Sequence, residues 1–132
     1  MAKQTSLSLA SHVSSPSIAR AAARGFLTGC NLDQLIEDTS LLVSELGTNA
    51  VLHGGSDIDL RMAADETTLR VEVFDTSERL AAVRNPGTDD EFGRGLHLVD
   101  ALAKHWGSDR CAGGKVTWFS LNAVTQHQLG TH

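Results

Sequence analysis

The sequence has few cysteines, no long apolar run and no acidic residue before Asp33, and each absence narrows the possible functions. No apolar stretch is long enough to cross a membrane or to form the core of a signal peptide. The two cysteines, Cys30 and Cys111, form no C-x-x-C pair, so we expect two reduced thiols in a cytoplasmic protein. The six histidines form no H-x-x-x-H or Cys/His cluster, which argues against a structural zinc site.

The net charge of −5, from 11 basic and 16 acidic residues, argues against a protein that binds nucleic acid directly. The acid-free start has the composition of an organellar transit peptide, but it also carries strand and helix signals, so we assign it to the fold. The length of 132 residues and a hydrophobic content of 41% predict one globular domain over residues 1–132. We expect an ordered core at about 5–122 and a flexible tail over residues 123–132.

In the first half of the chain, hydrophobic spacing predicts one strand and two helices. Residues 5–10 alternate between polar and apolar side chains, which indicates a short edge strand. Residues 14–16, Ser-Ser-Pro, are a helix-start signal, and Gly29 is placed to stop this helix. Residues 31–33 begin a second helix that ends at the glycine pair 54–55.

In the second half, alternation predicts strands over residues 57–62 and 69–73, joined by a hairpin connection at 64–67. Residues 76–92 show no periodic element, and a loop of this length is usually functional or mobile. A third helix is expected from the glycines at 93–95 to Trp106, with Gly107 ending it.

Two final strands are expected over residues 108–112 and 115–122, joined at the glycine pair 113–114. Trp106 and Trp118 are expected in the core. This order predicts an α/β (α+β) two-layer sandwich, in which three helices cover one face of a mixed, mostly antiparallel sheet.

The second helix carries an unusual polar stripe. Glu45, Asn49 and His53 follow one another at four-residue spacing, so they stack on one face of the helix. Leu42, Leu46 and neighbouring apolar residues occupy the other faces. A carboxylate, an amide and an imidazole in line are unusual on such a helix and indicate a binding site.

Other polar groups fit the same interpretation. Asp75 ends a strand and could accept a hydrogen bond from an exocyclic amine such as that of adenine. Glycines 93 and 95 open a helix, where backbone N–H groups and the helix dipole favour phosphate. The Asn49 amide offers a hard oxygen to Mg²⁺, and Glu45 could orient or deprotonate an attacking hydroxyl. Together these groups predict a nucleotide site.

From about Leu9 to Leu121 the sequence resembles the GHKL ATPase superfamily, whose ATP site is called the Bergerat fold, and within it the anti-sigma-factor serine kinases common in actinobacteria. Four motifs occur in order: E-L-x-T-N-A-x-x-H from Glu45 to His53, D-x-S from Asp75 to Ser77, G-R-G-L from Gly93 to Leu96, and G-K-x-x-W-F from Gly114 to Phe119. One motif alone would be weak, whereas four at family-like spacing are specific.

The resemblance implies ATP and Mg²⁺ as cofactors, Glu45 as the catalytic base and Asn49 as the metal ligand. It also implies that Asp75 contacts the adenine amine. The implied nucleotide-binding residues are Asn49, His53, Asp75, Ser77, Gly93, Arg94, Gly95, Leu96 and Thr117. The implied function is that of a cytoplasmic anti-sigma factor with serine/threonine kinase activity toward an anti-anti-sigma (STAS-domain) protein. Its partners would be that protein and a sigma factor, and homodimers are usual in this family.

Two departures from the family pattern support a second hypothesis. Thr76, Ser77 and Glu78 follow Asp75 where glycines are usual outside the subfamily. Relatives often have threonine at the position of Val116, whereas here Thr117 comes one residue later, which in a strand would place it on the opposite face. The alternative is therefore a sequestration module of the same fold that binds ATP weakly or not at all. A sensor-kinase catalytic domain is a third possibility, disfavoured because no phosphotransfer segment is present.

Each of these residues also has an ordinary interpretation. Glu45 alone would be a solvated helix carboxylate, and Asp75 alone a common strand-end residue. The pair of glycines at 93 and 95 is not a dinucleotide-binding fingerprint, because position 98 is leucine and no strand leads into it. For His53, capping of the helix end and a role at the site are equally supported.

Overall fold

The computed structural model describes residues 2–10, 15–49, 57–76 and 98–123. Its elements are β1 (Lys3–Leu9), α1 (Ser15–Gly29), the 3₁₀ turn η1 (Asp33–Leu35), α2 (Ile36–Asn49), β2 (Ile58–Ala64), β3 (Thr68–Asp75), β4 (His105–Cys111) and β5 (Gly114–Asn122). Residues 98–102 are also helical.

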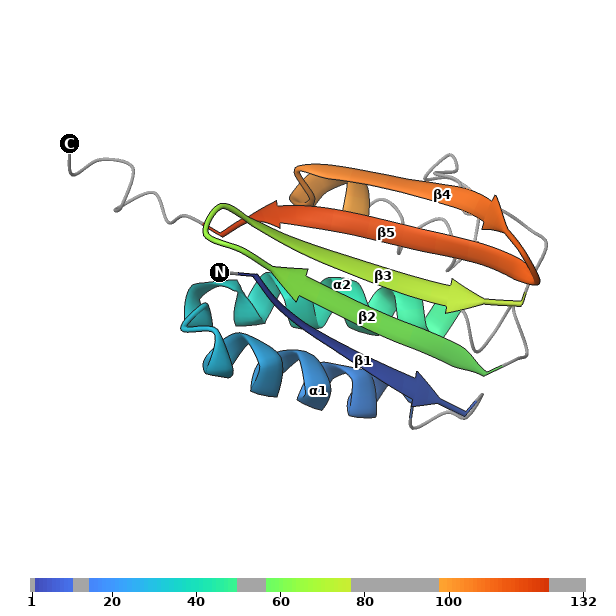
Figure 1. Cartoon of the computed structure of the whole chain (residues 1–132), viewed down its shortest axis with the longest axis horizontal. Helices are drawn as coiled ribbons and strands as arrows, with labels where there is room; N and C mark the ends of the chain where they lie inside the picture. Colours follow the sequence, from blue (N-terminus) through green and yellow to red (C-terminus); the bar gives the residue numbers. More distant parts are fainter. Residues whose placement is uncertain (1, 11–14, 50–56, 77–97, 124–132) are drawn as a thin grey trace.

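The five strands form one sheet in the order β1-β2-β3-β5-β4, and each neighbouring pair is antiparallel. The helices α1 and α2 lie side by side on one face of this sheet (Figure 1). The predicted α+β sandwich is therefore confirmed. The prediction that the first strand lies at a sheet edge is also confirmed.

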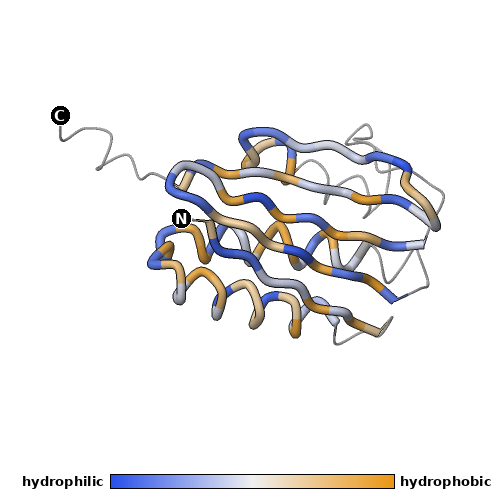
Figure 2. Tube along the Cα trace, in the orientation of Figure 1, coloured by the Kyte–Doolittle hydropathy of each residue, from blue (hydrophilic) through white to orange (hydrophobic). Residues whose placement is uncertain are grey.

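Alternation of side chains along the central strands builds the core. In β2, Ile58, Leu60 and Met62 are buried, and the residues between them face the other side of the sheet. The burial pattern of β3 has the same two-residue period, which is that of a strand with one covered face. Figure 2 shows this alternation as changes of hydropathy along the strands. The covered face of the sheet therefore lies toward α1 and α2.

The helix α1 presents small residues to the core. Ala19, Ala23 and Leu27 are buried at four-residue spacing, which lines them along one face. The helix ends at Gly29 as predicted, but Asn31, with φ of 60°, provides the left-handed residue. The N–H of Leu32 donates to the carbonyl of Leu27 at 2.8 Å, so a Schellman-type cap terminates the helix.

The C-terminal part differs from the sequence prediction at the end of the third helix. The helix ends at residue 102, and His105, Trp106 and Gly107 belong to β4. The N–H of Lys104 donates to the carbonyl of Ser120 at 2.8 Å, so the chain has already entered the sheet at this point. The four-residue spacing of Leu102 and Trp106 wrongly predicted that the helix continues to Trp106.

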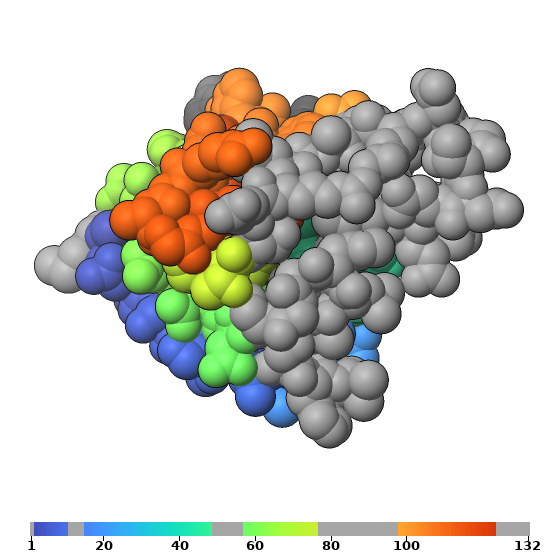
Figure 3. Space-filling model, turned by 90° about the vertical axis from the view of Figure 1, so that its right-hand side faces the viewer, coloured from blue at the N-terminus to red at the C-terminus, as the bar shows by residue number. Residues whose placement is uncertain are grey.

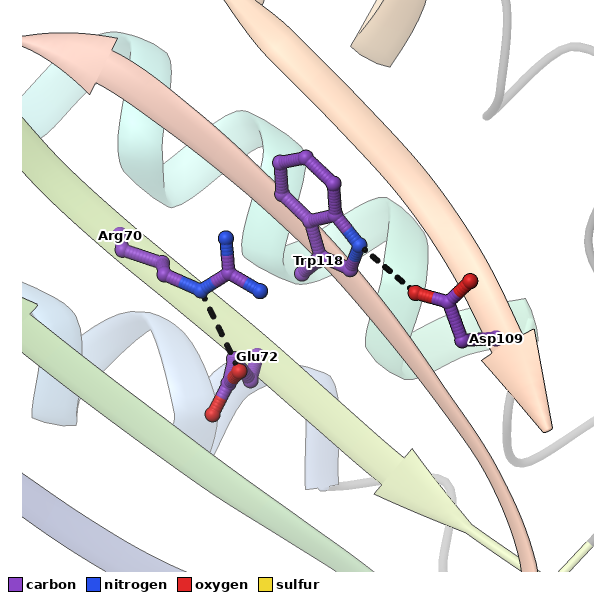
Figure 4. Close-up of polar contacts among 4 residues, drawn as sticks. All are labelled: Arg70, Glu72, Asp109 and Trp118. Atoms are coloured by element: carbon purple, nitrogen blue, oxygen red, sulfur yellow. Dashed lines mark hydrogen bonds and ion pairs between the residues drawn. The ribbon is translucent and has the colours of Figure 1, made fainter. Parts of the chain in front are cut away.

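Trp106 lies on β4 and packs against the core, and its Nε1 donates to Asp100 at 2.9 Å. Trp118 is different, because β5 places it on the open face of the sheet rather than in the core. There the Arg70 guanidinium stacks on its ring at 4.2 Å from the centroid, and its Nε1 donates to Asp109 at 3.2 Å (Figure 4). The prediction of a core position was wrong for Trp118, because the alternation of β5 turns it away from the face on which Thr117 and Phe119 are buried.

The predicted hairpin connection between β2 and β3 is confirmed, and one aspartate organises it. Asp65 accepts hydrogen bonds from the backbone N–H groups of Thr67 and Thr68, both at 2.8 Å. It also accepts one from the Thr67 hydroxyl at 3.2 Å. This side chain takes the place of the Asn-Gly pair found in tighter turns.

These bonds predict a stability that depends on pH. The backbone N–H groups of Thr67 and Thr68 hold the pKa of Asp65 below its ordinary value of 3.8. The contribution of Asp65 to the free energy of unfolding is therefore complete above pH 3.8 and is lost as pH falls through the lowered pKa. We expect Asp65→Asn to be less stable than wild type at pH 7, with a difference that shrinks below the ordinary pKa. Urea denaturation at a series of pH values measures this, with Asp38→Asn in α2 as the control. A difference that did not change with pH would contradict the role of the carboxylate.

Candidate functional site

The helix α2 brings the first candidate residue to the site. Its buried face contains Thr39, Leu42, Val43 and Leu46, which fix its rotation on the sheet. Glu45 follows that face and is half-buried, so its carboxylate is neither locked into the core nor fully in solvent. Asn49 is the last residue of α2, one turn beyond Glu45. Its side chain lies outside the described part of the structure.

The strand β3 carries the second candidate residue, Asp75. Asp75 is its last residue and is only 3% exposed. The alternation of β3 places Asp75 on the same face as Val71 and Val73, toward the helices. A carboxylate so deeply buried is rare unless a partner or ligand satisfies it.

The ends of three elements lie on this side of the fold. The C-terminal end of α2, the C-terminal end of β3 and the start of β5 lie at the same end of the molecule (Figure 1). Figure 3 looks onto this end, where the atoms of β2, β3 and the β4–β5 hairpin form one continuous surface. The topology therefore places the C-terminal part of the helix that bears Glu45 and the end of the strand that bears Asp75 at the same end of the sandwich.

Lys115 is a residue of this end to which the sequence alone assigned no role. It is the cross-strand neighbour of Asp75, and its Nζ lies 3.9 Å from the Asp75 Oδ2. Both side chains are buried, at 5% and 4% exposure. Burial lowers the pKa of Lys115, and the negative charge of Asp75 acts in the opposite direction. The signal in the sequence was the alternation of β5, which puts Lys115 on the same face as Phe119 and Leu121.

Gly114 allows the strands to approach at this point. A Cβ at this position would lie 2.0 Å from the carbonyl oxygen of Asp75 and 2.7 Å from the Cα of Thr76. No side chain can be accommodated at such distances. Glycine is therefore what permits β5 to begin directly against the end of β3, with Lys115 opposite Asp75.

Thr117 lies on the covered face, contrary to the expectation from its offset in the motif. It is 4% exposed, it pairs with Val73, and its hydroxyl lies 3.3 Å from that of Ser108. Val116 is the residue that faces the other side of the sheet. The register β5 adopts therefore keeps Thr117 on the same face as Asp75 and Lys115, and the one-residue shift does not remove it from this face.

Several predicted site residues lie outside the described part of the structure. They are His53, Ser77, Gly93, Arg94, Gly95 and Leu96. Their assignments remain predictions from the sequence motifs.

The described groups form a chemically coherent set. Asp75 is a buried acceptor at the end of a strand, as an exocyclic amine requires, and Thr117 adds a hydroxyl on the same face. Glu45 is a half-exposed carboxylate, which a general base needs in order to reach a substrate proton. Such a set can accept a hydrogen bond from an amine and take up a proton.

Comparison with known proteins identifies the family of this chain. Residues 9–121 match the family model described as the histidine kinase-like ATPase domain. A search of curated proteins gave no match.

Among solved structures, the chain is similar to the crystal structure of the RsbU and RsbW domains of Rv1364c from Mycobacterium tuberculosis. The TM-score is 0.70 at 22% sequence identity, and the similarity covers 89% of this chain. It covers 32% of the other chain, so this protein spans about a third of the length of that relative. At this identity the likeness establishes the fold. Within the described residues, no helix combines the length and apolar character needed to cross a membrane.

Proposed function

Because this chain belongs to the histidine kinase-like ATPase domain family, we propose that it binds ATP with Mg²⁺ and acts as an anti-sigma regulatory factor with serine/threonine kinase activity. The observation that carries the proposal is the buried Asp75 at the end of β3, on the face covered by the helix that bears Glu45. A carboxylate in this position is suited to accept a hydrogen bond from the adenine amine. In this proposal the Mg²⁺ ligand is Asn49.

In the proposed reaction, bound ATP supplies the γ-phosphoryl group, whose charge Mg²⁺ partly neutralises. Glu45 accepts the proton of a serine or threonine hydroxyl on the partner protein. The hydroxyl oxygen forms a bond to the γ-phosphorus, the bond from that phosphorus to the β,γ-bridging oxygen breaks, and ADP leaves. In this proposal the phosphate oxygens are held by Gly93, Arg94 and Gly95. The adenine ring is oriented by Asp75 and Thr117.

The proposed partners are a sigma factor, which the protein binds and silences, and an anti-anti-sigma protein with a STAS domain, which it phosphorylates. The similar Mycobacterium tuberculosis structure includes an RsbW domain. The fold that this chain shares with that structure supports the proposal. We further propose that the protein works in the cytoplasm as a homodimer.

The second candidate is sequestration of a sigma factor by a protein that binds ATP weakly or not at all. One of its two supports is removed, because Thr117 lies on the covered face despite its offset. The other, the absence of glycines after Asp75, remains.

ATP binding is expected to raise the melting temperature of the protein. A ligand that binds only the folded state stabilises it by about 2.7 kcal/mol at a concentration one hundred times Kd, which is a rise of several degrees. We expect this rise with millimolar ATP and Mg²⁺ and a much smaller one in Asp75→Asn, because asparagine is a weaker acceptor for the base amine. Differential scanning fluorimetry measures it.

The exposed Asp38 on α2 offers the matched control, since Asp38→Asn changes charge equally, away from the site. It should retain the full ATP-dependent rise. A melting temperature of the wild type that did not respond to millimolar ATP and Mg²⁺ would rule out the kinase and leave sequestration.

A further inference from the structure

The buried lysine beside Asp75 is unusual for its environment. Lysine is almost never fully buried unless its charge is paired, and here the side chain is 5% exposed. Its Nζ lies 3.9 Å from the Asp75 Oδ2, and the two residues are cross-strand neighbours. The ammonium is therefore held at the end of the sheet beside the carboxylate that the proposed function assigns to the adenine amine.

The hydrogen-bonding capacities of the two side chains are complementary. An ionised carboxylate only accepts hydrogen bonds, and an ammonium only donates them, with three N–H groups. The Watson–Crick edge of adenine presents a donor, the N6 amine, directly beside an acceptor, the ring nitrogen N1. An acceptor and a donor held side by side match this edge, whereas Asp75 alone matches half of it.

We propose that Lys115 is a specificity-determining residue of the nucleotide site, which donates from its ammonium to N1 of adenine while Asp75 accepts from the N6 amine. This inference rests on the proposed binding of ATP. In the ligand-free protein the two side chains form an ion pair, and on binding each also contacts the base. Lys115 thereby reads a second atom of the purine and keeps a positive charge beside Asp75.

The test compares ATP with 1-deaza-ATP, which has a C–H group in place of N1. Isothermal titration calorimetry on the full chain with Mg²⁺ gives Kd for both nucleotides. In the wild type, loss of a hydrogen bond to a charged donor should weaken binding of 1-deaza-ATP about ten- to a hundredfold. In Lys115→Met, ATP should bind more weakly than to wild type, and the preference for ATP over 1-deaza-ATP should disappear.

The exposed Lys104 provides the matched control, and Lys104→Met should retain the wild-type preference. Equal affinity of the wild type for both nucleotides would overturn the inference without any variant having to fold. An unchanged preference in Lys115→Met would overturn it as well, since Lys115 would then act only on the fold. If the wild type bound neither nucleotide, the proposed function would fail together with this inference. ATP binding without a 1-deaza effect would defeat only the role of Lys115.

Discussion

Replacement of Glu45 by glutamine is expected to slow phosphoryl transfer to a STAS-domain partner by about 10²–10⁴-fold, the usual contribution of general-base catalysis. Glutamine keeps the size and polarity of the side chain but cannot take up the hydroxyl proton. ATP binding should remain, because the groups proposed to hold the adenine ring lie on β3 and β5. Transfer of label from γ-labelled ATP, measured under single-turnover conditions, gives the rate of the chemical step.

The same helix supplies the control. Glu37 is exposed in the first turn of α2, and Glu37→Gln removes the same charge without touching the site. It should transfer phosphate at the wild-type rate. The ATP-dependent rise in melting temperature should be equal in both variants. A wild-type rate in Glu45→Gln would show that Glu45 is not the base, and a lost thermal response would show that it contributes to binding instead.

The parts of the fold that could be predicted are those in which a single periodicity decides the structure. The strands β2 and β3 alternate because one face is buried and the other is not, and this period is visible in the residues themselves. Glu45 and Asp75 lie within or at the end of such regular elements. The place of Asp75 at the end of its strand and of Glu45 within its helix therefore followed from counting residues, and the ends of these two elements lie at the same end of the molecule.

Other features could not be predicted, because they depend on contacts between distant segments. The start of β4 is set by a hydrogen bond from Lys104 to Ser120, whereas the local spacing continued a helix. Trp118 lies on the open face, where Arg70, on a different strand, covers its ring. The pairing of Lys115 with Asp75 could be identified only once the register of β3 against β5 was known.

The largest effect on stability is expected at Gly114. A methyl group there would lie 2.0 Å from the carbonyl oxygen of Asp75 and 2.7 Å from the Cα of Thr76, and both atoms belong to the backbone. No change of rotamer relieves such contacts, so β3 and β5 must separate. We expect Gly114→Ala to lower the free energy of unfolding by about 3 kcal/mol or more, as measured by urea denaturation. The separation would also move Lys115 away from Asp75, so the affinity for ATP should fall with the stability.

Gly25 in α1 offers the opposite case, because a Cβ there meets no atom within 4 Å. Gly25→Ala is expected to raise the free energy of unfolding by about 0.4–1 kcal/mol, since alanine loses less backbone entropy in a helix. ATP affinity should not change, because α1 carries none of the proposed site residues. Comparison of the two variants thus separates the general effect of an added methyl group from the effect of forcing β5 away from the end of β3. If Gly114→Ala were as stable as wild type, the close approach of β5 to the end of β3 would be wrong, and with it the pairing of Lys115 and Asp75.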